Sequence, residues 1–391
     1  MKVPINKSLM DVLILGCGNI GAAAAEDLAK SAFSAEVVLA DKDEAKAKKV
    51  AEKIGRSNVS WIRLDASKRN ELVNALGKFD LILGFLPGNL GYSLIEACIK
   101  AEKDLVDVSY TSQDPLRLNE EAVKADVTIV PDCGLAPGIS NIIVGYAAKK
   151  LDNVQKIHIM VGGLPEKPIP PIDYIITWSP ESLIDEYTRK ARIVIKGKTV
   201  EVEALSGIEE VNFPGVGKLE AFYTDGLRSL LKTFSGVDEM WEKTLRYKGH
   251  AKKIELLKAL GFFEDEEVDV DGVKISPKRF TARLFLKKLW KPNVKDVVAL
   301  KVEVLGLRAE KKIQHVYRLL DFYDVKSGTT AMARTTAYPA SIVAQMLLKG
   351  AVKAKGVVPP EKLGMGATFF TSFLRELEKR GIKIIEEEVT V

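Results

Sequence analysis

The feature that most constrains the fold of this 391-residue chain is the regular alternation of apolar runs and amphipathic stretches before residue 133. The apolar runs fit buried strands, at 11–15, 36–40, 59–64, 80–86, 104–108 and 127–130. The stretches between them fit helices, at 20–30, 42–54, 69–76, 92–101 and 115–125. Such alternation predicts right-handed βαβ units, and therefore an α/β domain with a doubly wound parallel sheet.

After residue 132 the pattern changes to that of an α+β domain with a mostly antiparallel sheet. The segments that indicate this are helices at 137–151 and 277–290, a strand at 158–161, a hairpin at 191–205, and alternating strands at 297–305 and 312–323. Late helices at 335–349 and 369–379 could return to the first domain. We therefore expect three parts, at 1–132, 133–330 and 331–391.

Composition excludes several classes of function. The net charge of +5 is spread over mixed-sign helices, so no nucleic-acid-binding face is expected. Three distant cysteines, Cys17, Cys98 and Cys133, with only three histidines, argue against a disulfide framework and against a metal site. No uncharged apolar run reaches the ~18 residues that a membrane span requires. We expect a cytoplasmic protein that contacts neither membrane nor nucleic acid.

A glycine motif follows the first predicted strand. Gly16, Gly18 and Gly21 form G-x-G-x-x-G, with Asn19 and Ile20 opening a helix rich in alanine. Gly16 permits a tight turn, Gly18 lets a pyrophosphate approach the backbone, and Gly21 lets helix and strand pack closely. The phosphates would lie at the helix N-terminus, where N–H groups are unpaired. The motif in this context indicates a dinucleotide-binding domain of the Rossmann type.

The ends of three further strands extend this prediction. Asp41 follows Gly21 by 20 residues, where an acid binds the adenosine ribose hydroxyls and repels a 2′-phosphate, so NAD is favoured over NADP. Asp65 could contact the adenine or could be an acid near a helix start. Leu86 and Pro87 should border the crevice at the topological switch point.

Several runs resemble the saccharopine dehydrogenase (reductase) family. They are 16–21, 106–110 and 131–138, and then 219–222, 246–251 and 332–338, which look like its L-lysine 6-dehydrogenase branch. The resemblance spans about residues 11 to 381. It implies a homodimer that uses NAD to deaminate the ε-amine of L-lysine oxidatively, giving allysine (which cyclises to piperideine carboxylate) and ammonia.

Such a reaction needs a proton acceptor and a cation for the substrate carboxylate. Asp107, at the end of the fifth strand, could act on the ε-amine or could be a capping acid. His250 could carry protons near neutral pH or could be structural. Cys133 is expected to be a buried, inert thiol.

For the carboxylate we expect Arg246, next to Tyr247 in the sequence, with Arg334 and Arg228 as further candidates. An ion pair between domains or subunits is the competing interpretation of Arg334. Two rival functions stay open: a saccharopine or carboxypolyamine dehydrogenase, which would need another arginine, and a non-catalytic NAD-binding scaffold or sensor.

Overall fold

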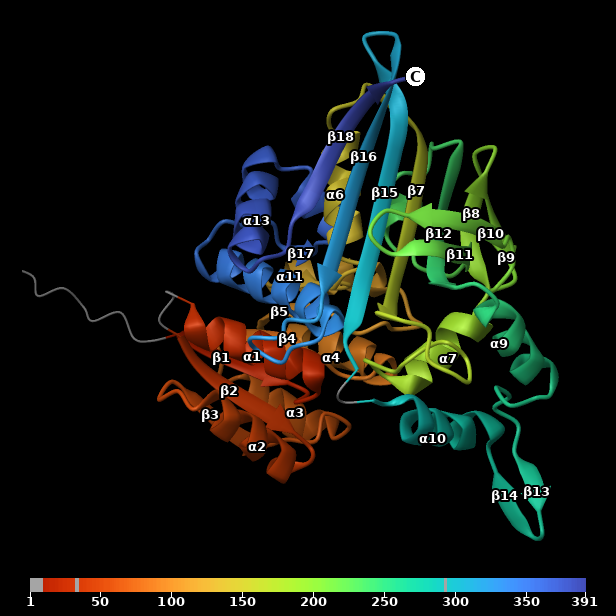
Figure 1. Cartoon of the computed structure of the whole chain (residues 1–391). Helices are drawn as coiled ribbons and strands as arrows, with labels where there is room; N and C mark the ends of the chain where they lie inside the picture. The colour runs from red at the N-terminus through yellow and green to blue at the C-terminus, as the bar shows by residue number, and fades with distance from the viewer. Residues whose placement is uncertain (1–9, 32–34, 292–293) are drawn as a thin grey trace, which may run out of the picture. The chain divides into compact units, whose positions relative to one another are not determined.

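The computed structural model describes residues 10–31, 35–291 and 294–391 (Figure 1). The chain divides into two compact units. The first comprises the chain up to residue 134 together with 336–359, and the second comprises 135–335 together with 360–391.

The first unit contains a seven-stranded sheet in which all neighbouring strands are parallel. Its strands, in chain order, are β1 (Met10–Leu15), β2 (Ala35–Asp41), β3 (Val59–Arg63), β4 (Leu81–Gly84), β5 (Asp104–Asp107), β6 (Thr128–Val130) and β17 (Gly356–Val357). The spatial order is β17-β6-β5-β4-β1-β2-β3. Because the connections leave β1 in opposite directions, right-handed crossovers place helices on both faces. The predicted doubly wound sheet is confirmed.

The helices of this unit connect its strands. They are α1 (Asn19–Lys30), α2 (Glu44–Ile54), α3 (Arg69–Leu76), α4 (Gly88–Lys100), a 3₁₀ turn at Pro115–Leu118 and α5 (Asn119–Lys124). Local signals set their ends: the Asp43 carboxylate accepts the Lys46 N–H to start α2, and Gly55, with φ of +63°, ends it. The core between sheet and helices is aliphatic, with Leu13, Ile82 and Leu105 fully buried.

The second unit is built on a nine-stranded mixed sheet. Its main path runs β10-β11-β12-β7-β15-β16-β18, and β8 joins β12 to β9. The strands are β7 (Asn153–Pro165), β8 (Ala191–Ile195), β9 (Lys198–Val202), β10 (Glu209–Phe213), β11 (Gly217–Tyr223), β12 (Glu239–Tyr247), β15 (Asp296–Arg308), β16 (Lys311–Phe322) and β18 (Ile384–Thr390). All pairs are antiparallel except β7 with β12. The predicted α+β domain with a mostly antiparallel sheet is confirmed.

The remaining elements surround this sheet or extend from it. They are α6 (Ile139–Ala148), α7 (Pro180–Thr188), α8 (Leu230–Thr233), α9 (His250–Ala259), α10 (Pro277–Leu289), α12 (Pro360–Gly364), α13 (Ala367–Lys379) and a separate hairpin of β13 (Val268–Val270) and β14 (Val273–Ile275). Helix α11 (Ala331–Leu348) begins in the second unit and continues into the first. Helix α13 belongs to the second unit. No helix in the described residues is long and apolar enough to cross a membrane.

Candidate cofactor and substrate sites

The three motif glycines meet different surroundings, which separates their roles. A Cβ on Gly16, whose φ is +99°, would lie 2.4 Å from the Phe85 carbonyl oxygen. A Cβ on Gly21 would lie 1.9 Å from the Gly16 carbonyl oxygen. A Cβ on Gly18 meets nothing within 4 Å. The fold therefore requires glycine at Gly16 and Gly21, whereas at Gly18 the space is open and suits a ligand.

Helix α1 begins directly at this open space. The Ala22 N–H donates to the Gly18 carbonyl, so the earlier N–H groups of Asn19, Ile20 and Gly21 point out of the helix end. Such a helix N-terminus attracts the negative charge of a phosphate. The residues thus fit a dinucleotide pyrophosphate.

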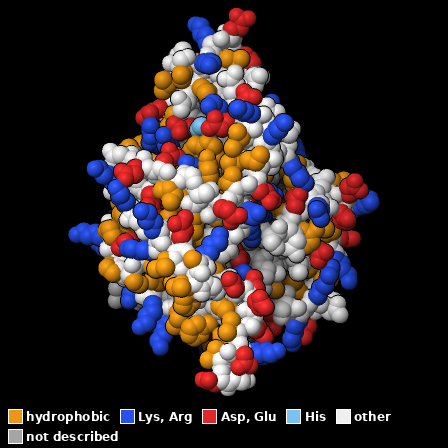
Figure 2. Space-filling model, turned by 90° about the vertical axis from the view of Figure 1, so that its right-hand side faces the viewer, with side chains coloured by type: hydrophobic (Ala, Val, Ile, Leu, Met, Phe, Trp, Pro, Cys, Tyr) orange, Lys and Arg blue, Asp and Glu red, His pale blue; other side chains and the backbone are white. Residues whose placement is uncertain are grey.

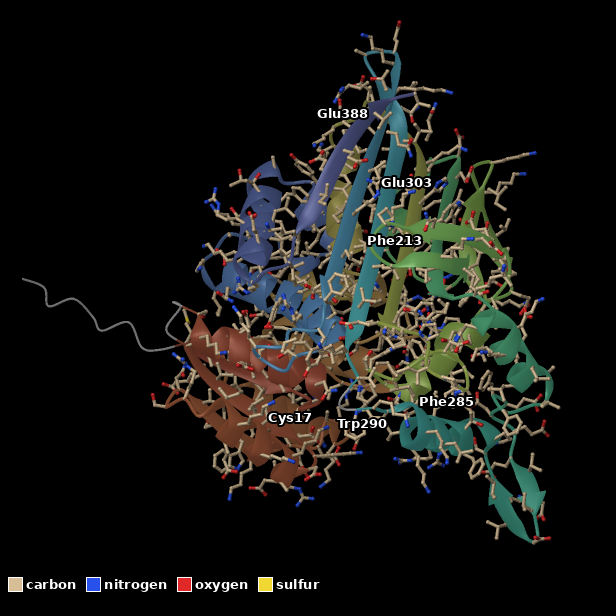
Figure 3. The ribbon with its side chains drawn as sticks, in the orientation of Figure 1. Cys17, Phe213, Phe285, Trp290, Glu303 and Glu388 are labelled. Atoms are coloured by element: carbon tan, nitrogen blue, oxygen red, sulfur yellow. The ribbon has the colours of Figure 1, made fainter. Side chains whose placement is uncertain are left out.

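Asp41 is held beside the glycine loop. Its Oδ2 accepts the Cys17 N–H at 2.9 Å and its Oδ1 accepts the Asp43 N–H at 3.1 Å. Lys46 Nζ lies 3.4 Å from Oδ2. Figure 3 marks Cys17 within this loop, where burial raises the pKa of its thiol to about 12. The carboxylate is therefore fixed next to the glycine turn, and its binding of the ribose hydroxyls stays a prediction.

Positive charge also lies near Asp41. Arg63 lies opposite Asp41 in the register of the neighbouring strands β3 and β2. A shallow depression on this side is lined by Lys42, Asp43, Glu44, Ala45, Lys48 and Arg63. The positive charges of Lys42, Lys48 and Arg63 would attract the additional 2′-phosphate of NADP.

The other predicted cofactor residues are placed as follows. Asp65 Oδ1 accepts both the Ser67 N–H and hydroxyl, and these bonds lower the pKa of the Asp65 carboxyl. These hydrogen bonds favour the interpretation of Asp65 as an acid in the turn before α3 over a contact with the adenine. Leu86 packs against the core of the first unit, and Pro87 precedes the first residue of α4. Both follow Phe85, whose carbonyl faces Gly16, so they lie next to the glycine loop.

Asp107 is a fully buried carboxyl at the end of β5. Ser109 donates its hydroxyl to Oδ1 at 2.8 Å and its N–H to Oδ2 at 3.2 Å. Burial raises the pKa of Asp107 to about 7; the bonds from Ser109 oppose this shift and the charge of Asp132 adds to it. A carboxyl with such a pKa exchanges protons near neutral pH, as a general base must.

Cys133 follows Asp132 and is also fully buried. Burial raises the pKa of its thiol, and the charge of Asp107 raises it further. A thiol that keeps its proton is a poor nucleophile. These findings support the expected inert cysteine.

In the second unit, Arg246 lies at the centre of a buried polar cluster. Its Nε donates to the Tyr187 hydroxyl at 3.2 Å, one terminal nitrogen donates to the Leu245 carbonyl at 2.9 Å, and the other lies 3.2 Å from Glu186 Oε1. Its guanidinium lies 4.6 Å from the centre of the Tyr174 ring. A guanidinium carries five N–H groups. Three have these partners within the described residues, so two can meet a further acceptor.

His250 joins this cluster, but its contacts oppose the role that the sequence suggested. Its Nδ1 donates to the Ile172 carbonyl at 2.6 Å, so its Nε2 accepts from the Tyr187 hydroxyl at 2.9 Å. Burial lowers the pKa of His250 to about 3, and the positive charge of Arg246 lowers it further. The imidazole thus stays neutral with both nitrogens engaged. The expectation that His250 carries protons is corrected: it positions Tyr187, which in turn orients Arg246.

Tyr247 and Arg334 contact groups other than Arg246 in the described residues. Tyr247 points to the opposite face of β12 and donates its hydroxyl to the Pro165 carbonyl at 2.8 Å. Arg334 lies 3.3 Å from Asp321 and 3.5 Å from Asp324, and it donates to the Arg380 carbonyl. Arg334 therefore forms ion pairs within the second unit rather than offering a free fork. Arg228 has φ of +53°, and its charge acts to lower the pKa of Glu242.

Sequence reasoning missed Glu186 and Tyr187, which orient Arg246, and the buried Glu242. Both of the first two lie on α7, whose start is marked by Ser179 and Pro180, a frequent N-cap and first-turn pair. Burial raises the pKa of Glu242 to about 8, with further increases from Glu186 and Asp225. No spacing rule connects Glu242 on β12 with α7, because tertiary packing of this helix on the strand brings them together, as the contacts of Glu186 with Thr244 and Arg246 show.

The strand order, the open glycine loop and the anchored acid define a dinucleotide-binding domain of the Rossmann type. Comparison with known proteins narrows this class. The family model described as the saccharopine dehydrogenase NADP binding domain matches residues 12–130, and that of the saccharopine dehydrogenase C-terminal domain matches 134–382. The chain belongs to the saccharopine dehydrogenase family, a family of oxidoreductases.

Several relatives are similar over most of this chain. The saccharopine dehydrogenase [NADP(+), L-glutamate-forming] of Saccharomyces cerevisiae is 24% identical, over 90% of this chain and 93% of its own. The carboxyaminopropylagmatine dehydrogenase of Synechocystis is also 24% identical, over 90% and 92%. The alpha-aminoadipic semialdehyde synthase of Arabidopsis thaliana is 26% identical over 96% of this chain, which spans only 44% of that protein.

Among solved structures, the saccharopine dehydrogenase (L-Glu forming) of Saccharomyces cerevisiae shares the fold. Its TM-score is 0.79 at 21% identity, and the match covers 97% of this chain and all of the yeast chain. This agreement confirms the fold that the sequence predicted.

Proposed function

We propose that this chain is an NAD-dependent dehydrogenase that removes the ε-amine of L-lysine oxidatively, acting as a cytoplasmic homodimer. In the balanced reaction, lysine, NAD⁺ and water give allysine, ammonium, NADH and one proton. A bound nicotinamide supplies the hydride acceptor for Cε. Everything else must come from side chains and backbone of the chain.

The cofactor part of the proposal rests on Asp41. Its carboxylate is anchored to the Cys17 N–H next to the open space at Gly18. A carboxylate there accepts hydrogen bonds from ribose hydroxyls and repels a 2′-phosphate. The backbone N–H groups of Asn19 and Ile20 would hold the pyrophosphate.

A second candidate, NADP, is favoured by the cations beside Asp41 and by the name of the matching family model. The two are separated by measuring both dissociation constants by fluorescence titration. We expect NAD to bind at least about tenfold more tightly, a difference of about 1.4 kcal/mol. Equal affinities would refute the role given to Asp41.

The proton part of the proposal rests on Asp107. Hydride leaves Cε only after the ε-ammonium has lost a proton, so the reaction needs a base. A buried carboxyl with a pKa near 7 is a suitable base at neutral pH. Ser109 holds this carboxyl in one orientation through both of its oxygens.

The substrate part rests on Arg246, whose orientation is fixed by Tyr187, Glu186 and Tyr174. Its two remaining N–H groups suit a single α-carboxylate. Saccharopine carries additional carboxylates and would need more arginines. Arg334 forms ion pairs with Asp321 and Asp324. The number of candidate arginines for a second substrate carboxylate is therefore one smaller than the sequence suggested. This favours lysine.

The competing substrates, saccharopine and carboxylated polyamines, are favoured by the names of the relatives. Product stoichiometry distinguishes them. We expect L-lysine labelled with ¹⁵N at the ε-position to release one labelled ammonium per NADH. Release of an amino acid from saccharopine, with no ammonium from lysine, would refute the proposal.

A further inference from the structure

The hairpin of β13 and β14 forms a two-stranded sheet of its own. We call this hairpin the arm. Its register sets Val268 opposite Ile275 and Val270 opposite Val273, so these four side chains share one face. Val268, Val270 and Val273 are 51%, 47% and 60% exposed. A two-stranded sheet is only marginally stable alone in water. A partner that covers this exposed face of β-branched side chains would therefore stabilise the arm.

Helix α10, which follows the arm in the chain, has a second uncovered surface. Its inner face is buried through Ala282, Phe285 and Leu289. Phe280, Leu284 and Trp290 lie on its outer side and stay 48%, 37% and 48% exposed. Figure 3 labels Phe285 and Trp290, which lie on this helix and at its C-terminal end. In Figure 2, hydrophobic side chains gather towards the lower end of the molecule among charged ones.

The charges of these two surfaces are opposite. Residues 264–271, which precede the arm and form its first strand, contain six acids and no base, whereas residues 274–291 contain seven bases and no acid. Of the bases, Lys278 is paired within the chain, to Asp265 and Asp185. Arg279, Arg283 and Lys287 are exposed and lie on the outer side of α10, between its apolar residues.

We propose that two copies of this chain meet here, with the arm of each copy lying on the outer face of α10 of the other. A twofold arrangement makes this contact twice, because residue i meets residue j and residue j meets residue i. The valine face then covers Phe280 and Leu284, and the acidic residues that precede the arm, at 264–267, lie near Arg283 and Lys287. The acidic residues at 264–271 would repel a polyanion or an acidic protein. A second copy of this chain carries both an acidic and a basic segment, so its charges are complementary to those of the first copy.

This inference goes beyond the proposed reaction and gives the proposed homodimer a surface. The two can fail separately. A monomer that deaminates lysine would contradict the proposed dimer surface and support the proposed reaction. A dimer that depends on the arm but does not deaminate lysine would support the surface and contradict the reaction.

The test measures the mass of the full chain by light scattering across a range of concentrations. We expect the wild type at twice 43.0 kDa and V270K/V273K at 43.0 kDa. A matched control is V325K, because Val325 is 69% exposed in a turn outside this surface. Its mass should equal that of the wild type. Since all three valines are exposed, circular dichroism should show unchanged folding.

A charge-reversal series tests the pairing itself. E266K/E267K in the acidic segment before the arm and R283E/K287E in α10 should each halve the mass, and the chain carrying all four changes should regain the wild-type mass. A monomeric wild type, a dimer that survives V270K/V273K, or a fourfold variant that stays monomeric would overturn the proposal.

Discussion

Replacing Gly18 with valine should abolish dinucleotide binding while the protein stays folded. In the structure, φ at Gly18 is −71° and ψ is −177°, an extended conformation that valine adopts readily. A Cβ at this position meets no atom within 4 Å. The substitution therefore costs only the preference for glycine over valine at a helix N-cap, about 1 kcal/mol.

The loss of binding should be far larger. The valine branches would occupy the space through which a pyrophosphate reaches the N–H groups at the start of α1. Each hydrogen bond to a charged phosphate contributes about 1.5–3 kcal/mol. If two are lost, the dissociation constant for NAD should rise roughly a hundredfold to ten-thousandfold.

The assay combines NAD titration with thermal unfolding. The matched control is Gly236→Val, because a Cβ on Gly236 also meets nothing within 4 Å, but this glycine lies in the second unit. The control should bind NAD normally. Gly21→Ala, by contrast, forces a Cβ to 1.9 Å from a backbone oxygen and should lower the melting temperature. A folded Gly18→Val protein with wild-type affinity for NAD would refute the role given to the loop.

Four further substitutions test the rest of the account. Asp41→Ala should reduce the preference for NAD over NADP, measured as the ratio of the two dissociation constants by titration. An unchanged ratio would show that groups other than Asp41 determine the preference. For Asp107, kcat/KM of the wild type should rise tenfold per pH unit up to about pH 7 and then level, whereas Asp107→Asn should remove this limb. Because folding raises the pKa of Asp107 from 3.8 to about 7, the folded state binds the proton more tightly, so this stabilising contribution is present below pH 4 and lost as the pH rises through 7. The loss is about 4 kcal/mol, and denaturant unfolding should show wild-type stability falling relative to Asp107→Asn over this range. Arg246→Lys should raise KM for lysine by tenfold or more, about 1.4 kcal/mol, and leave the affinity for NAD unchanged. His250→Ala should mainly lower the free energy of unfolding, by about 2–5 kcal/mol. A lower kcat in a His250→Ala protein of wild-type stability would instead support a role of His250 in proton transfer.

The sequence predicted the first unit well because its information is local. Glycines, strand ends and helix caps lie within a few residues of the groups they control, as with Asp43 and the start of α2. Asp41 could be placed for the same reason, since a βαβ unit fixes its distance from Gly21 along the chain. The strand β17 was missed, because it is two residues long and joins β6 from more than 200 positions later.

The second unit was less predictable because its contacts depend on sheet register. Arg246 lies opposite Glu220 on β11 and next to Glu186 on α7, and neither spacing follows a local rule. The pairing of Arg334 with Asp321 and Asp324 depends on how α11 follows β16. Likewise, burial decides that His250 stays neutral, and the sequence shows a histidine without showing its surroundings.

The most direct test of the proposed function is kcat/KM for NAD⁺ reduction, measured in parallel with L-lysine, saccharopine, L-ornithine and polyamines. We predict the highest value with L-lysine, with ammonium formed in equal amount to NADH. A higher value with saccharopine or a carboxylated polyamine would contradict the assignment of the substrate. NAD binding without turnover of any amine would instead identify a non-catalytic NAD-binding protein.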